Sequence, residues 1–100
     1  MPPSAPDRRS RIEVLLRERL AAQHVEVVDE SHLHAGHAGA AGGAGHFRTL
    51  IVSTRFEGKS LVERQRLVYG ALSELMRDEI HALAMRTLTP EQWQAGEARS

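Results

Sequence analysis

The stretch FRTLIVSTRFEGKSLVERQRLVYGAL, residues 47–72, decides the fold of this chain. Residues 47–56 are rich in β-branched and aromatic side chains, which favours a β-strand. The tetrapeptide EGKS then turns the chain, and Ser60 and Glu63 have the spacing of a capping box at a helix start. Apolar residues at helical spacing predict a long amphipathic helix with the stripe Leu61, Val68, Leu72 and Leu75, widened by Leu67, Ala71 and Met76.

The segments before this stretch predict a helix and a strand. Residues 8–23 carry an apolar stripe at helical spacing, and this helix begins either with Ser10 as its cap or nearer Asp7. Residues 24–31 alternate as a short strand does. Two strands that follow each other with one connector between them favour an antiparallel hairpin.

The segments after it predict a strand and a short helix. Residues 80–89 alternate loosely and indicate a third strand, which a strand–helix–strand crossover places parallel to the second. In TPEQW, Thr89 can cap a helix, Pro90 suits its first position and Trp93 would anchor it on the body. The predicted order is therefore α-β-β-α-β-α, an α+β fold (an α/β sandwich) in which helices cover one face of a three-stranded mixed sheet.

The 100 residues have the size of one small domain. We expect a flexible N-terminal tail over residues 1–9, the domain over 10–95 and a polar tail over 96–100. Residues 32–46, HLHAGHAGAAGGAGH, are expected to form a flexible Ala/Gly/His loop between the first two strands.

Composition excludes several classes of protein. The chain has no cysteine, so it has neither a disulfide nor a thiolate nucleophile or ligand. Thirteen basic residues balance thirteen acidic ones, so no global charge draws it to nucleic acid. No stretch is apolar enough for a membrane span or a signal peptide, which predicts a cytoplasmic protein without a membrane partner. The polar residues suggest no catalytic constellation, so we expect no enzyme.

Histidine is the residue type that most suggests a site. Residues 32–46 hold four of the six histidines: His32, His34, His37 and His46. By their residue types alone, loop imidazoles are more often solvated than metal-bound, and His81 at a strand start is more often structural. Imidazole nevertheless suits several transition metals. Lys59, Arg64 and Arg66 at the start of the second long helix form either a solvated face or a binding surface.

Three stretches together resemble the BolA family. They are VVDESHLHA (27–35), GHFRTLIVSTRFEGKSLVERQRLVYGAL (45–72) and IHALAMRTLTPEQW (80–93). The most specific parts are the HF…V-S-x-x-F-x-G run, the R-x-R-x-x-V-Y helix and the H-A-L…T-P-x-x-W ending. The resemblance covers roughly residues 10–93 and implies an α-β-β-α-β-α fold related to the K-homology type II topology.

The resemblance also implies a function. BolA-like proteins pair with monothiol glutaredoxins, and the pair shares a [2Fe–2S] cluster with glutathione. This chain would contribute His81 and His34, with His37 and His46 as substitutes for His34. The isolated protein is then expected to be a monomer that holds no cluster.

A second function implied by the resemblance is DNA-binding transcriptional regulation of stress response, morphology and biofilm. Lys59, Arg64 and Arg66 would then contact either the protein partner or DNA phosphates. The family usually has R-H-R where this chain has Arg64-Gln65-Arg66, which weakens any metal or DNA role at Gln65. A third possibility is that cluster state controls DNA binding.

Overall fold

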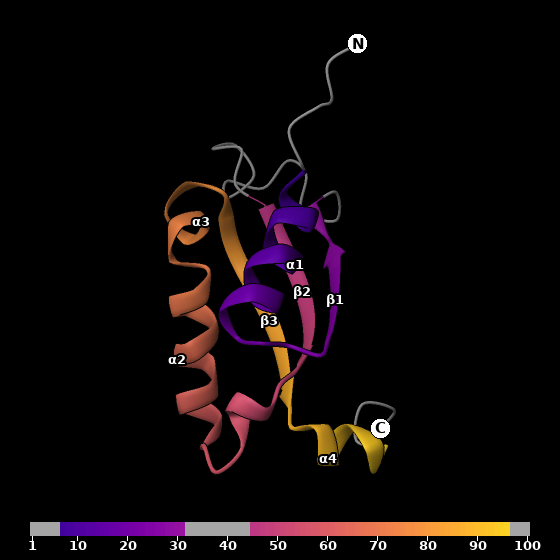
Figure 1. The fold of residues 1–100 in the computed structure, drawn as a ribbon. Coiled ribbons are helices and arrows are strands. Elements are labelled where there is room, and N and C mark those ends of the chain that lie inside the picture. The colour runs from indigo at the N-terminus through magenta and orange to yellow at the C-terminus, as the bar shows by residue number, and fades with distance from the viewer. Residues whose placement is uncertain (1–6, 32–44, 97–100) are drawn as a thin grey trace.

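The computed structural model describes residues 7–31 and 45–96, and in this part the helices α1, α2 and α3 lie on one side of a three-stranded sheet (Figure 1). The elements in chain order are α1 (Arg8–Arg19), β1 (His24–Asp29), β2 (Gly45–Val52), the 3₁₀ turn η3 (Thr54–Phe56), α2 (Leu61–Ala71), α3 (Ser73–Asp78), β3 (Ile80–Leu88) and α4 (Pro90–Gln94). The predicted α+β class and mixed sheet are confirmed. Most of the predicted tails and loop, residues 1–6, 32–44 and 97–100, lies outside the described residues.

β2 is the central strand of the sheet. It pairs antiparallel with β1 and parallel with β3, as the order of elements predicts. The strand begins at Gly45, so Gly45 and His46 belong to the sheet and not to the loop in which we expected them. It ends at Val52, earlier than the predicted residue 56, because Ser53 caps the 3₁₀ turn that follows.

One face of the sheet carries the core. Along β2, Phe47, Thr49 and Ile51 are buried under the helices, while Arg48 between them is exposed on the opposite face. This is the alternation expected of a sheet with one covered face. The buried apolar cluster lies between the helices and the sheet and consists of Ile12, Leu16, Leu20, Ala22, Val25, Val27, Phe47, Ile51, Phe56, Val68, Ala71, Leu72, Leu75 and Ile80.

The long helix predicted after residue 60 is interrupted. The capping box of Ser60 and Glu63 is present at the start of α2, as predicted. Leu72 then ends α2 and precedes α3, with a backbone conformation (φ −108°, ψ 15°) outside the helical range. Leu61 shares the face of Val68 by helical period, yet it is 62% exposed, so its predicted place in the apolar stripe is wrong.

The first and last helices begin as their caps direct. Asp7 caps α1 by accepting a hydrogen bond from the Ser10 amide, so the helix starts nearer Asp7 than Ser10. Thr89 and Gln92 form the capping box of α4, with Pro90 in its first turn. Trp93 anchors this helix on β1 by packing against His24, with the two ring centroids 3.9 Å apart.

Within the described residues, no helix is long and apolar enough to cross a membrane.

Ser53 holds the end of β2 to two other elements. Its side chain is fully buried, and its hydroxyl donates to the Leu20 carbonyl at the end of α1 over 2.5 Å. The same oxygen accepts from the Arg55 amide at 3.0 Å. The Ser53 amide donates to the Leu88 carbonyl at the end of β3 over 3.0 Å. One buried serine therefore connects α1, β2, η3 and β3.

We expect Ser53→Ala to lower the free energy of unfolding by about 1–3 kcal/mol, because it leaves the buried Leu20 carbonyl and the Arg55 amide without their partner. Urea denaturation followed by circular dichroism measures this change. Ser73→Ala, at an exposed position of α3, is the matched control and should change stability little. Equal effects of the two substitutions would contradict this role for Ser53.

Candidate functional site

Two histidines meet at the end of the sheet where β2 and β3 begin. His46 is the second residue of β2 and His81 is the second residue of β3. Their ring centroids lie 5.0 Å apart, with the ring planes inclined by 50°. His81 is exposed and His46 is partly buried, so the pair is open to solvent on the His81 side.

An irregularity in the strand pairing helps to bring these rings together. Gly45 lies opposite Ile80, but His46 lies opposite Ala82, so β3 has one residue more than β2 at this point. The extra residue is His81. A bulge of this kind frees a side chain from strict alternation between the two faces and often re-aims it at a functional site.

Backbone contacts hold the start of β2 from both sides. The Gly45 amide donates to the Glu79 carbonyl at 2.9 Å, and the His46 amide donates to the Ser31 hydroxyl at 3.1 Å. The position of Gly45 has no room for a side chain. A Cβ there would lie 2.6 Å from the Ser31 Oγ and 2.7 Å from the buried Phe47 ring. The position of His46 is therefore set by close packing on neighbouring residues.

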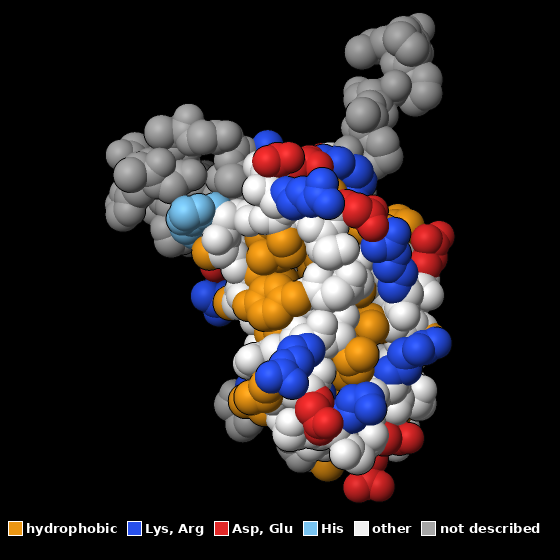
Figure 2. Space-filling model, turned by 90° about the vertical axis from the view of Figure 1, so that its left-hand side faces the viewer, with side chains coloured by type: hydrophobic (Ala, Val, Ile, Leu, Met, Phe, Trp, Pro, Cys, Tyr) orange, Lys and Arg blue, Asp and Glu red, His pale blue; other side chains and the backbone are white. Residues whose placement is uncertain are grey.

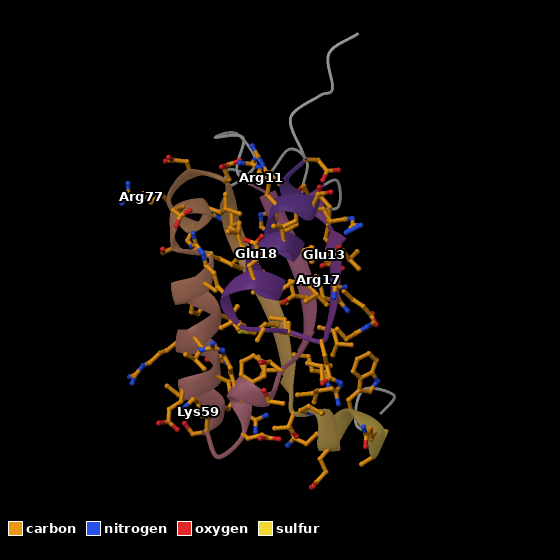
Figure 3. The ribbon with its side chains drawn as sticks, in the orientation of Figure 1. Arg11, Glu13, Arg17, Glu18, Lys59 and Arg77 are labelled. Atoms are coloured by element: carbon orange, nitrogen blue, oxygen red, sulfur yellow. The ribbon has the colours of Figure 1, made fainter. Side chains whose placement is uncertain are left out.

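Glu79 ties α1 to the start of β3. Its carboxylate accepts hydrogen bonds from the Arg11 guanidinium, one of them from Nη1 over 3.0 Å, and Arg8 Nε lies 3.7 Å away. The hydrogen bonds from Arg11 lower the pKa of Glu79 below its ordinary value of 4.5, against the opposing effect of partial burial. Figure 3 shows Arg11 at the end of α1 that lies over the start of β3.

The predicted loop ligands are not among the residues that the structure describes. His34 and His37, like His32, fall outside the described residues, and their metal-ligand roles stay predictions. Of the histidines that the sequence suggests as ligands, the structure brings together His81 and His46. The predicted parallel pairing of residues 47–56 with 80–89 was the signal for this contact, because it puts the starts of both strands at one end. The bulge at His81 had no such signal.

The cations at the start of α2 differ in their surroundings. Arg64 is partly buried and donates to the carbonyls of Lys59 and Thr87 and to the Gln92 side chain, at 2.9–3.1 Å. Its guanidinium carbon also lies 5.9 Å from the centroid of the Phe56 ring. These contacts connect α2 with β3, α4 and η3, so Arg64 supports the fold whatever else it binds.

Lys59 and Arg66 are exposed, and apolar side chains accompany them. Leu61 is 62% exposed, Val62 54% and Tyr69 43%. Figure 2 shows this side of the molecule, where hydrophobic side chains reach the surface between lysines and arginines. Figure 3 places Lys59 where the chain enters α2. We call the five residues Lys59, Leu61, Val62, Arg66 and Tyr69 the α2 surface.

The donor set fits a shared metal group only in part. Within residues 7–31 and 45–96, no group of three or more histidine, cysteine or acidic side chains could hold a metal ion. Two neighbouring imidazoles are present, and the whole chain has no cysteine. Imidazoles do serve as ligands of iron–sulfur clusters together with thiolates. Here every thiolate would have to come from another molecule.

The fold and the site define a small α+β domain with two histidines at one end of its sheet and a cationic, partly apolar helix surface that begins beyond the other end. The chain matches the family model described as BolA-like protein over residues 16–92. It belongs to the BolA-like family.

Relatives and solved structures agree with this assignment. The chain is 45% identical over 82 residues to BolA-like protein 1 of Mus musculus, covering 82% of this chain and 58% of the mouse protein. It is 40% identical over 86 residues to the DNA-binding transcriptional regulator BolA of Escherichia coli K12, covering 86% and 79%. The crystal structure of a Bol-like protein from Babesia bovis superimposes with a TM-score of 0.76 at 38% identity, covering 95% and 99%. The chain thus spans less than two thirds of the mouse relative.

We expect Glu79→Gln to destabilise the protein at neutral pH and to have a shrinking effect as the solution is acidified. The folded-state pKa of Glu79 is lowered, so its pairing stabilises the fold above about pH 4.5 and is lost as pH falls through that lowered pKa. Denaturation midpoints of both proteins between pH 7 and pH 3 measure this. A difference that stays constant over this range would contradict a charge pair with Arg11 and Arg8 as its cause.

Proposed function

We propose that this protein is a non-catalytic adaptor of the cytoplasm that pairs with a monothiol glutaredoxin to share a [2Fe–2S] cluster in iron–sulfur trafficking or iron and redox sensing. Membership of the BolA-like family supports this proposal. The single observation that carries it is the position of His81, which is exposed at the end of the sheet with a second imidazole beside it.

The ligand inventory supports a shared cluster over one held by this chain alone. The protein has no cysteine, so the thiolates come from the glutaredoxin and from glutathione. His81 supplies one imidazole, and His34 is the second ligand that the family resemblance implies. A neutral imidazole in place of a thiolate raises the reduction potential of such a cluster, which suits a complex that senses or passes on its cargo. The free protein is then a monomer without a cluster.

The α2 surface is the part of the protein that we assign to partner contact. Exposed Lys59 and Arg66 can attract carboxylates of the partner protein, and charges of this kind mainly accelerate association. The apolar side chains Leu61, Val62 and Tyr69 beside them give area that a partner can bury. Arg64 uses its Nε and Nη1 groups for hydrogen bonds within the fold, so exposed Lys59 and Arg66 carry this role better.

The test is reconstitution with a monothiol glutaredoxin, ferrous iron, sulfide and glutathione, followed by visible circular dichroism. We expect a heterodimer spectrum that differs from that of the glutaredoxin homodimer, because an imidazole replaces a thiolate ligand. His81→Ala should abolish it and His34→Ala should alter it. His24→Ala is the matched control, since His24 packs on Trp93 at the other end of the sheet. A heterodimer spectrum that survives His81→Ala unchanged would rule out this ligand assignment.

A second candidate function is DNA-binding transcriptional regulation. It is favoured by the relative from Escherichia coli, which is named a DNA-binding transcriptional regulator and is 40% identical over 86 residues. Exposed Lys59 and Arg66 could contact phosphates at the start of α2. In the combined alternative, cluster state would decide whether these cations are available to DNA.

For this alternative, we expect salt-dependent binding of the free protein to promoter duplexes. Arg66→Ala should weaken binding to all sequences and reduce the salt slope by about 1, as for loss of one phosphate contact. Fluorescence anisotropy at several salt concentrations measures both. Arg77→Ala, an exposed arginine of α3, is the matched control. Equally strong DNA binding by the Arg66→Ala and Arg77→Ala variants would place the DNA contact elsewhere. The same measurement with the cluster-loaded heterodimer tests whether cluster state controls DNA binding.

A further inference from the structure

We infer that His46 and His81 form a site for one divalent transition-metal ion of the zinc class, which the protein binds without any glutaredoxin. The two rings come from neighbouring parallel strands, with centroids 5.0 Å apart and planes inclined by 50°. This mononuclear site differs from the shared cluster in its ligands, since it needs neither a thiolate nor the loop residue His34.

The separation of the rings matches that of two imidazoles on one ion. A Zn–N bond is about 2.1 Å, and a ring nitrogen lies about 1.1 Å from its ring centroid, so two imidazoles on a tetrahedral ion have centroids about 5 Å apart. The observed 5.0 Å agrees with this geometry. The ring planes are inclined by 50°, so the pair differs from parallel stacked rings. The nitrogen lone pairs of parallel stacked rings would not converge on one ion.

The backbone around both histidines is already ordered by other contacts. The His46 amide is bound by the Ser31 hydroxyl, and the His46 carbonyl accepts from the Glu30 amide at 2.8 Å. His81 is the extra residue of β3 between two paired positions. Little backbone entropy is therefore lost when this pair takes up an ion, whereas a glycine-rich segment such as residues 32–44 would have to be ordered on binding.

The nearby carboxylates are engaged elsewhere, so the site is an open one. Glu79 binds Arg11 and Arg8, and Glu30 lies 3.1 Å from Arg48. No third ligand stands near the pair within the described residues. Water would therefore complete the coordination, and the ion would exchange readily. Zn²⁺, Ni²⁺ and Cu²⁺ all accept imidazole nitrogen.

Such an ion would compete for His81. A histidine bound to zinc cannot at the same moment be a ligand of the shared cluster, so zinc would hold the protein in a form that accepts no cluster. This consequence alone rests on the proposed function. The metal site itself stands on the geometry of His46 and His81 and does not depend on it.

The experiment uses the full chain and Zn²⁺ alone, without glutaredoxin, iron or glutathione. To exclude any zinc binding by the imidazoles of residues 32–44, the background carries His32→Ala, His34→Ala and His37→Ala together. Isothermal titration should show one zinc ion per chain in this background. Adding His81→Ala should weaken binding about a hundredfold, because the second imidazole no longer acts within the same molecule. His81 is exposed, so its loss leaves the core unchanged.

Two further measurements distinguish the assigned pair from other histidines. Adding His24→Ala to the background should leave the affinity unchanged, although His24 lies 2.7 Å from Glu26 and could attract zinc there. Long-range ¹H–¹⁵N spectra should show zinc-induced shifts of the His46 and His81 ring nitrogens. Loss of zinc affinity with His24→Ala, unchanged affinity with His81→Ala, or an unshifted His46 ring would each overturn the proposal. Cluster reconstitution is measured separately, so either result can fail while the other stands.

Discussion

The parallel pairing of β2 with β3 is the constraint on which both the core and the candidate site depend. On the covered face of β2, Phe47 and Ile51 are buried beneath the helices. At the start of the same strand, His46 meets the bulged start of β3 and the ring of His81. A change of register by one residue would turn both sets of side chains to the opposite face. Core packing therefore fixes the register that places the imidazoles.

The two ends of the sheet use histidine differently. At one end His24 lies between Glu26, 2.7 Å away, and the ring of Trp93, and it joins β1 to α4. At the other end His46 and His81 face each other, and β3 is tied to α1 through Glu79. An imidazole held between an acid and an indole serves the fold, whereas the other end of the sheet brings exposed His81 beside the partly buried ring of His46.

The cations at the start of α2 also differ in role: one supports the fold and another is exposed. Arg64 joins four elements through the carbonyls of Lys59 and Thr87, the Gln92 side chain and the Phe56 ring. Arg66 is exposed only two residues further on. Because successive helical residues point in different directions, neighbouring arginines in one motif can have unrelated roles. The sequence motif contains both arginines without indicating which of them faces the body.

The sequence by itself determined the local structure of this protein. The capping boxes of Ser60 and Thr89 begin helices where the pattern predicts them, and the order of elements is sufficient for the mixed sheet. These features follow from interactions between residues three or four positions apart. The pattern could not predict the break at Leu72 or the exposure of Leu61, because each depends on what lies beneath the helix.

For the candidate site, the sequence supplied the chemistry of its residues and the tertiary structure decided which of them meet. The absence of cysteine means that this chain supplies no thiolate, and its histidines supply imidazole ligands. His46 and His81 are 35 positions apart in the sequence, and only the folded sheet brings them together. The bulge at the start of β3 adds His81 as an extra residue opposite β2. Strand register and bulges come from packing between distant segments, which no local spacing records.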